Sequence, residues 1–366
     1  GPSAGVVAAS FIGRQCGASK VITFDMGGTS ADISLIENYS PKVSNERLVE
    51  GYPARIPMIN IITIGAGGGS IARIDEGNAL KVGPESAGAV PGPACYGRGG
   101  TQPVVTDANI VLGKLNQNRI LGGRMKVHLE KAYQALDEYI CAKSSLSREE
   151  AANGIITVVN SNMVRAVRSV SVEKGYDVRE FSLMAFGGAG PLHACEVAQE
   201  LGIREVIIPP HPGTLCSLGL LLADTKFDLS RTNILDATKE NILLFNNEFS
   251  DMLLQGAKAL DREGIVQERR IFECSIDMRY QRQNFEINIP VASGVLTEET
   301  LEKALSDFHA EHKRSYGYCN ENAPVQFVSY RVSAIGIIDK PEMEAKPMEP
   351  EAPLPKPIEV RRVLYQ

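Results

Sequence analysis

The residue types that could do chemistry are concentrated between residues 21 and 36. A β-branched apolar run ends at Asp25, the turn Gly27-Gly28-Thr29-Ser30 follows, and alternating apolar and polar residues then resume. This pattern predicts a β-hairpin with a loop large enough for a phosphate. Successive glycines let backbone N–H groups approach an anion, the two hydroxyls add donors, and Asp25 can hold a hydrated Mg²⁺. The stretch favours a nucleotide-phosphate site, with a tight hairpin that binds nothing as the alternative.

The loop differs from a Walker loop, because no Gly-Lys-Ser/Thr follows and the chain continues into a strand. A second turn, Gly187-Gly188-Ala189-Gly190, lies between an expected strand at 181–186 and an expected helix that begins at Pro191. Its glycines would leave a flat surface for a purine and a ribose. A plain strand-to-helix turn would have a similar sequence, but the two loops together favour a nucleotide cleft.

Three motifs in the middle of the chain allow both a chemical and a structural interpretation. The glycine-rich run 65–70 could cradle a phosphate or let a substrate approach the backbone, or it could be a mobile hairpin tip. Cys95 could be a nucleophile, but it has no histidine near it in sequence to activate it. Asp107 is expected in the first turn of a short helix, where capping is favoured over ligand binding.

Histidine and arginine side chains leave further alternatives open. His193 is expected just inside the helix after the second turn, either facing the cleft as an acid, base or ligand, or packed in the interior. Arg165 and Arg168 share one helix and are expected to be solvated, with a phosphate contact as the alternative. His309 and His312 have i, i+3 spacing without a cysteine nearby, which favours a helix face over a metal site.

Composition limits the class of protein. The chain has 366 residues, of which 22% are charged and 43% hydrophobic, and its net charge is -6. These values describe a globular protein with room for two domains. The acidic balance argues against nucleic acid or an anionic membrane as the main partner, and we recognise no transmembrane run or signal peptide. Seven scattered cysteines without a Cys-x-x-Cys pair favour reduced thiols and a cytoplasmic location.

Periodicity and breaker residues predict the elements that position these motifs. In the first part we expect helices at 4–17, 128–142, 147–174, 191–201 and 213–222, and strands at 21–25, 31–37, 42–49, 59–64, 181–186 and 205–208. A Gly/Pro-rich insertion is expected at about 51–146. After a boundary near 226–240 we expect helices at 241–264 and 297–315 and strands at 272–280, 285–289 and 325–338. The proline-rich stretch 341–358 is expected to be an extended linker.

Residues 25–32 resemble the second phosphate motif of the actin, Hsp70 and sugar kinase superfamily, and residues 186–191 resemble its adenosine motif. Within that superfamily, the sequence is similar to the hydantoinase/oxoprolinase A-type subunits, such as N-methylhydantoinase A and 5-oxoprolinase. The similar segments follow family order along nearly the whole chain: 1–7, 24–34, 65–71, 91–97, 106–109, 187–193 and 316–318.

This resemblance implies an α/β fold class. The expected architecture is the second half of an actin-like, RNase H-like ATPase fold with the insertion, followed by a smaller α+β domain. We therefore expect an ATPase domain at 1–228, an α+β domain at 229–340 and a proline-rich tail at 341–366. The resemblance also implies that a lobe with the first phosphate motif precedes this chain and a β-rich segment follows it. The chain would then be a fragment that is inactive when isolated.

The resemblance further implies an ATP- and Mg²⁺-dependent hydrolase that opens a cyclic amide by phosphorylating its oxygen, together with a B-type partner subunit. Asp25 would orient Mg²⁺ or the attacking group. The residues that would hold phosphates are Gly27, Gly28, Thr29 and Ser30, and those that would border the adenosine are Gly187, Gly188 and Gly190. Two alternatives are a subunit of an ATP-dependent ketone carboxylase and a non-catalytic assembly module.

Overall fold

The computed structural model describes residues 1–44, 47–49, 52–54, 58–118, 120–292, 295–341 and 356–365. The chain forms two compact units. Unit 1 contains Gly1–Leu222 and the described residues 356–365, and unit 2 contains Ala223–Pro341. Within the described ranges, no helix combines the length and the apolar character that crossing a bilayer requires.

The central sheet of unit 1 has the strand order β12-β11-β1-β2-β3, and β8 also pairs with β2. The strands are β1 (Lys20–Met26), β2 (Ala31–Glu37), β3 (Ser40–Pro41), β8 (Ile61–Ile64), β11 (Ser182–Phe186) and β12 (Val206–Ile207). β1 is antiparallel to β2 and parallel to β11. The predicted strands at 21–25, 31–37, 181–186 and 205–208 therefore lie in one mixed sheet.

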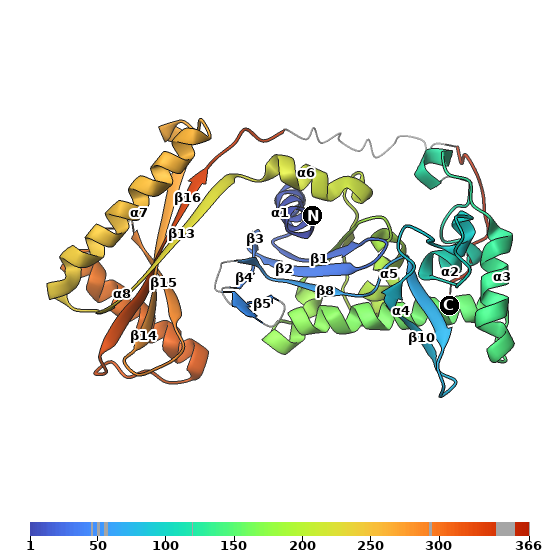
Figure 1. Cartoon of the computed structure of the whole chain (residues 1–366), viewed down its shortest axis with the longest axis horizontal. Coiled ribbons are helices and arrows are strands. Elements are labelled where there is room, and N and C mark those ends of the chain that lie inside the picture. The colour runs from blue at the N-terminus through green and yellow to red at the C-terminus, as the bar shows by residue number, and fades with distance from the viewer. Residues whose placement is uncertain are drawn as a thin grey trace. The chain divides into compact units, whose positions relative to one another are not determined.

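Helices cover both faces of this sheet. They are α1 (Pro2–Cys16), α4 (Arg148–Val170), α5 (Gly190–Leu201) and α6 (Leu215–Leu222). Figure 1 shows α1 and α6 on one side of the strands and α4 on the other. Alternate residues of β1 serve the two faces, since Val21 packs with the α1 and α6 side while Ile22 and Phe24 pack with the α4 and α5 side.

The prediction of a strand at 42–49 is wrong where the structure describes this range, and residues 45 and 46 lie outside the described residues. Instead of one strand over 42–49, β3 pairs with the end of β2, and β8 pairs with Ala31–Ser34 of the same strand. Between them lie two short ladders, in which β4 (Val43–Ser44) pairs with β7 (Met58–Ile59) and β5 (Arg47–Val49) pairs with β6 (Tyr52–Ala54). Pro41 has no N–H to extend the β3 ladder, and β8 occupies the remaining edge of β2.

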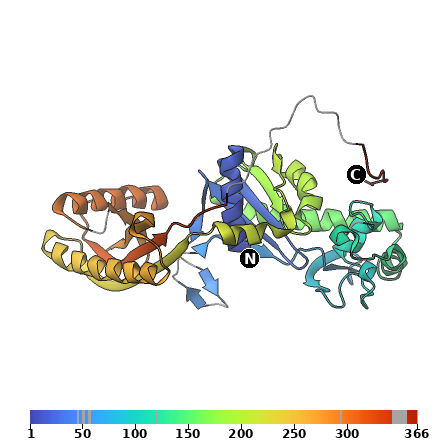
Figure 2. The same cartoon turned by 90° about the horizontal axis from the view of Figure 1, so that it is seen from above.

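The segments between β8 and α4 gather at one end of unit 1, drawn in cyan and teal in Figures 1 and 2. They comprise β9 (Ser70–Ile74), β10 (Leu80–Ser86), α2 (Val105–Val111) and α3 (Leu129–Tyr139). Short 3₁₀ helices span Ala94–Tyr96, Ile120–Gly123, Cys141–Lys143, Val172–Lys174, Val178–Glu180 and Pro212–Thr214. At the start of α4, Ser147 and Glu150 form a capping box, and the helix buries an apolar stripe.

Unit 2 is an antiparallel sheet in the order β13-β16-β14-β15 with helices α7 and α8. Its elements are β13 (Thr225–Asp236), α7 (Ile242–Arg262), β14 (Arg270–Tyr280), β15 (Ile287–Val291), α8 (Glu298–Tyr316) and β16 (Val325–Gly336), with 3₁₀ helices at Lys239–Asn241 and Gln267–Arg269. Both long helices contribute to one apolar core with the sheet. The stretch read from its composition as a boundary is the strand β13, in which half-buried and exposed residues alternate.

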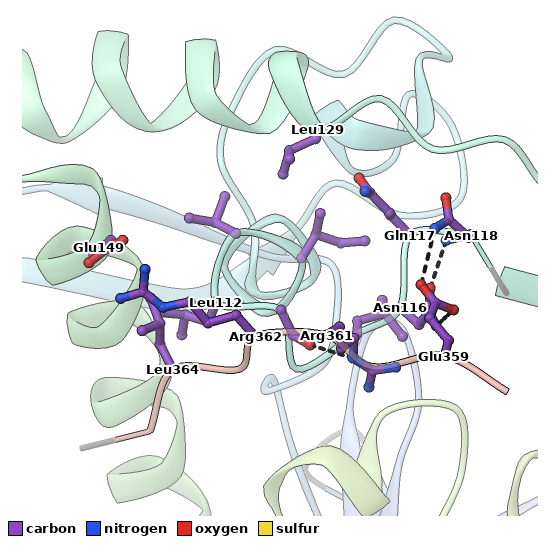
Figure 3. Close-up of a pocket in the computed structure, with 14 residues that line it drawn as sticks. Leu112, Asn116, Gln117, Asn118, Leu129, Glu149, Glu359, Arg361, Arg362 and Leu364 are labelled. Carbon is purple, nitrogen blue, oxygen red and sulfur yellow. Dashed lines mark hydrogen bonds between the residues drawn. The ribbon is translucent and has the colours of Figure 1, made fainter. Parts of the chain in front are cut away.

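Most of the predicted linker at 341–358 lies outside the described residues. The described residues 356–365 pack against the end of α2 in unit 1. The Leu364 N–H donates to the Leu112 carbonyl at 2.9 Å, and Arg361 Nε donates to the Gly113 carbonyl at 3.0 Å. Figure 3 shows Glu359 accepting hydrogen bonds from Asn116 and Asn118 beside a cavity of about 250 Å³.

Candidate functional site

Three glycine-rich turns meet at the carboxyl end of β1. The Ala189 N–H donates to the Met26 carbonyl at 2.9 Å, which fixes the turn before α5 against β1. The Gly68 N–H donates to the Gly27 carbonyl at 3.0 Å, which fixes the run 65–70 against the β1–β2 loop. The structure therefore brings the turn 187–190 to Asp25 and the loop 27–30, which lie more than 150 residues earlier in the sequence.

The loop between β1 and β2 presents its backbone to solvent. The Gly27 N–H donates to the Ser30 carbonyl at 3.0 Å and closes the turn. Gly28 and Thr29 are exposed, and a Cβ added at Gly28 would meet nothing within 4 Å. Within the described residues, the N–H groups of Gly28 and Thr29 have no backbone acceptor outside the strand ladder. Two free donors on a glycine turn suit an anion such as a phosphate.

The run 65–70 packs against this loop and stabilises it. Gly67, Gly68 and Gly69 are buried, and the Gly69 N–H donates to the Gly28 carbonyl at 2.6 Å. A Cβ at Gly67 would lie 2.6 Å from the Gly28 carbonyl carbon. The interpretation of this run as a mobile hairpin tip is wrong, because its glycines are needed for contact with another backbone segment.

Two of the three glycines in the turn 187–190 are also closely packed. Gly187 has φ +81°, and a Cβ there would lie 2.4 Å from Asp25 Oδ1. A Cβ at Gly190 would lie 3.1 Å from the Phe24 carbonyl oxygen. Gly188, by contrast, is exposed with open space around it, so it is the glycine of this turn that a ligand could approach.

Asp25 belongs to a row of polar side chains on one face of the sheet. It is the cross-strand partner of Asp32, which is in turn the partner of Thr63. The Thr63 hydroxyl donates to Asp32 Oδ1, and at the other end of the row the Cys216 thiol donates to Asp25 Oδ2 at 3.3 Å. The row presents two neighbouring carboxylates, each held by one hydroxyl or thiol donor.

Burial raises the pKa of Asp25, and the nearby Asp32 carboxylate adds to this effect, while the Cys216 thiol opposes it. Burial also raises the pKa of Cys216 to about 11, helped by Asp25, so the thiol keeps its proton and acts as the donor. A divalent cation between the two carboxylates would relieve their repulsion.

The row was only partly predicted from the sequence. Asp32 could have been found, because the hairpin prediction places it opposite Asp25. Thr63 and Cys216 carry no local signal, since their contacts come from β8 and α6. Among the described residues, no group of three histidine, cysteine or acidic side chains could hold a metal. A pair of carboxylates nonetheless fits Mg²⁺, which keeps most of its water ligands and takes one or two carboxylates.

Asp107 is a buried anchor for the loop that contains Cys95. Its carboxylate accepts N–H groups from Cys95 at 2.8 Å, Val104 at 3.0 Å and Ala94 at 3.2 Å. It lies in the first turn of α2, as predicted, and its side chain also holds the N-cap residue Val104. Cys95 is fully buried, and burial together with Asp107 raises the pKa of its thiol strongly. A buried neutral thiol is a poor nucleophile, which disfavours the catalytic interpretation of Cys95.

His193 is packed in the interior, which was one of the two predicted alternatives. Its Nδ1 lies 2.8 Å from Asn160 Oδ1, and its Nε2 lies 3.2 Å from Asn109 Nδ2. Asn160 Nδ2 donates to Glu196 at 2.6 Å, which fixes the amide and therefore places the histidine proton on Nδ1. Burial lowers the pKa of His193 to about 3, and Lys114 contributes, so the ring is neutral.

In unit 2, His312 packs inward, whereas its neighbour His309 is half-buried. His312 is fully buried, with Nδ1 at 2.8 Å from the Tyr318 carbonyl oxygen. His309 stacks on Tyr280, and its Nδ1 lies 2.7 Å from the Tyr280 hydroxyl. Neither histidine belongs to a metal-binding group among the described residues. The pair completes an aromatic cluster that includes Tyr316.

Comparison with known proteins shows which proteins this chain is similar to. Residues 1–229 match the family described as hydantoinase/oxoprolinase. The caprolactamase subunit alpha of Pseudomonas jessenii is 37% identical over 97% of this chain and 52% of its own length. The acetophenone carboxylase gamma subunit of Aromatoleum aromaticum is 33% identical over 85% of this chain and 43% of its own length.

The crystal structure of the ATP-dependent caprolactamase from Pseudomonas jessenii has a TM-score of 0.78 at 36% sequence identity. The match covers 96% of this chain and 52% of that one. This likeness confirms the predicted α/β fold class. The chain spans about half the length of the curated relatives it matches.

Proposed function

The chain belongs to the hydantoinase/oxoprolinase family, and from this premise we propose that it forms part of an ATP-dependent hydrolase subunit that opens a cyclic amide. The candidate substrates are a hydantoin, 5-oxoproline or a related lactam. The observation that carries the proposal is the meeting of the exposed 27–30 loop, the Asp25–Asp32 pair and the open Gly188 turn at one end of the sheet.

Different groups of the site would contact the phosphates, the metal and the adenosine. The free N–H groups of Gly28 and Thr29, with the Thr29 and Ser30 hydroxyls, would hold phosphate oxygens. Asp25 and Asp32 would hold Mg²⁺ through its water ligands. The Gly188 turn would lie against the adenosine. When bound, ATP supplies the phosphoryl group that activates the amide oxygen, so that water can attack the carbonyl carbon.

The whole enzyme is proposed to contain a second, B-type subunit. The relatives named above are called subunit alpha and gamma subunit, so each works within a larger assembly. The isolated chain, which covers about half of its relatives' length, is expected to bind the nucleotide weakly and to hydrolyse little.

A second candidate function is a subunit of an ATP-dependent ketone carboxylase. The specific observation in its favour is the 33% identity to an acetophenone carboxylase subunit. The same phosphate loop and carboxylate pair would then serve the phosphorylation of an enol or of bicarbonate. Substrate identity, and not the nucleotide site, separates the two candidates.

The test is phosphate release by the complete subunit with its partner and Mg²⁺-ATP. The substrate panel contains hydantoin, 5-oxoproline, caprolactam and acetone with bicarbonate. We expect a cyclic amide to stimulate phosphate release and Asp25→Asn to lower the stimulated rate by about 100-fold or more, because the variant loses one of the two charges at the metal. The matched control is Glu76→Gln, an exposed carboxylate in the β9–β10 turn, which should keep the wild-type rate.

Stimulation by the ketone alone would transfer the assignment to the carboxylase candidate. An unchanged rate in Asp25→Asn would remove Asp25 from the site. If no compound stimulates phosphate release in either protein, the proposal of a catalytic subunit fails and an assembly module becomes the better interpretation.

A further inference from the structure

A cavity of about 430 Å³ in unit 1 lies apart from the carboxylate row. It is bounded by β8, the β9–β10 hairpin and α4. Ile62 and Ile64 of β8 line it, whereas Thr63 between them belongs to the carboxylate row. Because successive strand residues point to opposite faces, the cavity and the carboxylate row lie on opposite sides of the sheet.

One wall of the cavity is apolar and the other is polar. Val82 and Pro84 of β10 continue the apolar wall that Ile62 and Ile64 begin. The polar wall comes from α4, where Asn162, Arg165 and Ser169 line the cavity. Their spacing places them on one helix face. The cavity therefore has an apolar body and one polar side, as small-molecule sites commonly do.

The polar side carries one positive charge that is held in place. Arg165 Nη2 donates to Asn162 Oδ1, three residues earlier on the same helix, and this contact orients the guanidinium. Arg165 is exposed at the mouth of the cavity, and no acidic residue lies among the described residues that line it. An oriented guanidinium without a lining carboxylate favours an anion that can accept two parallel hydrogen bonds.

We propose that this cavity binds a small carboxylate that carries a short apolar chain. The carboxylate would pair with Arg165, and the chain would lie against Ile62, Ile64 and Val82. Inorganic phosphate is a poorer match, because it would cover these apolar side chains without any apolar surface of its own. The proposal concerns a site beyond the proposed nucleotide site and needs no nucleotide.

The cavity is connected to the phosphate loop through one short segment. Gly65 and Ala66 line the cavity, and the next three residues are the glycines that support the loop 27–30. A ligand in the cavity would therefore contact the same segment that fixes the phosphate loop. The expected consequence is a nucleotide affinity that changes when the carboxylate is bound.

The test is calorimetric titration of the 366-residue chain with hexanoate in the absence of nucleotide. We expect saturable binding in the wild type, at least ten-fold weaker binding in Arg165→Gln, and wild-type affinity in the matched control Arg168→Gln. Arg168 is also exposed on α4 but does not line the cavity. Ser169→Leu, which fills the cavity and keeps the guanidinium, should also weaken binding. Thermal unfolding of each variant confirms that it is folded.

Parallel titrations with hexan-1-ol and inorganic phosphate separate the contributions of the charge and of the chain. Weaker binding of both, relative to hexanoate, supports the proposal. The proposal is overturned if hexanoate does not saturate, if Arg165→Gln and Arg168→Gln bind it equally, or if phosphate binds more tightly than hexanoate. None of these outcomes depends on ATP hydrolysis, so they leave the proposed function untouched.

Discussion

A chain of hydrogen-bonded polar groups links α2, α4 and α5, and all of its members are buried except Glu196, which is half-buried. It runs from Asn109 through His193 and Asn160 to Glu196, which also accepts a hydrogen bond from the buried Lys114. Among the described residues, every buried polar side-chain atom of this chain has a hydrogen-bond partner except Asn109 Oδ1. Such a network holds its helices in one arrangement, because breaking any link leaves a polar group buried without a partner.

The neutral state of His193 predicts how stability depends on pH. The folded pKa is about 3 and the unfolded value is 6.5, so protonation favours the unfolded chain. The contribution is fully present above pH 6.5 and is lost as the pH falls below it. Between pH 7.5 and 5.5, the free energy of unfolding of the wild type should fall by about 1.4 kcal/mol more than that of His193→Gln. Denaturant titrations at the two pH values measure this difference, and equal declines in both proteins would contradict it.

At the scale of single residues, the sequence predicted where a side chain lies in the fold better than which groups it contacts. Asp25 and Asp107 lie where their motifs placed them, in the β1–β2 hairpin and in the first turn of α2. The three N–H groups that Asp107 accepts could not be anticipated, because two of them come from a loop more than ten residues earlier. Cys216 is the extreme case, since its contact with Asp25 spans 191 residues.

Among the elements, the packing of one glycine turn on another is sensitive to the addition of a single side-chain carbon. Gly67→Ala places a Cβ 2.6 Å from the backbone of Gly28 and Thr29, and neither segment can move without disturbing the phosphate loop. We expect a loss of about 1–3 kcal/mol in stability and weaker nucleotide binding, because overpacking displaces backbone. Gly77→Ala is the matched control, since its Cβ would lie 3.4 Å from the flexible side chain of Asp75.

Unfolding curves and nucleotide titrations of the complete subunit measure both effects. If Gly67→Ala and Gly77→Ala behave alike, the close contact between the two turns does not control the phosphate loop.

Elements with strong local signals were predicted well. α4 has its capping box and apolar stripe, and α8 (Glu298–Tyr316) ends at Gly317 with φ +81°. Strands were predicted less well where pairing with a distant strand decides whether and where the strand forms. β13 was missed because its many polar residues were read as a composition shift, although their alternation with apolar residues is a strand signal. The edge of β2 was misassigned because β8, more than twenty residues later, competes for it.

At the scale of the whole molecule, the two units have separate cores. Among the described residues, the core of unit 2 is made of residues between Leu229 and Val332, and Phe308 in it is fully buried. We therefore expect residues 223–341 expressed alone to fold and to unfold in one cooperative transition. In this fragment Phe308→Ala should cost about 3–5 kcal/mol. Circular dichroism during thermal unfolding tests both statements, and a fragment without a cooperative transition would show that unit 2 depends on the rest of the chain.

Pairing between the first and last strands of unit 2 brings its two ends together. Thr225, at the start of β13, is the cross-strand partner of Gly336, at the end of β16. A unit whose ends are adjacent can be joined end to end by a short linker and reopened elsewhere. Circular permutants of unit 2 that begin in the turn between α7 and β14 should keep every strand pairing. The same geometry makes unit 2 a transferable module, which could be inserted into a surface loop of another protein without stretching either host or guest.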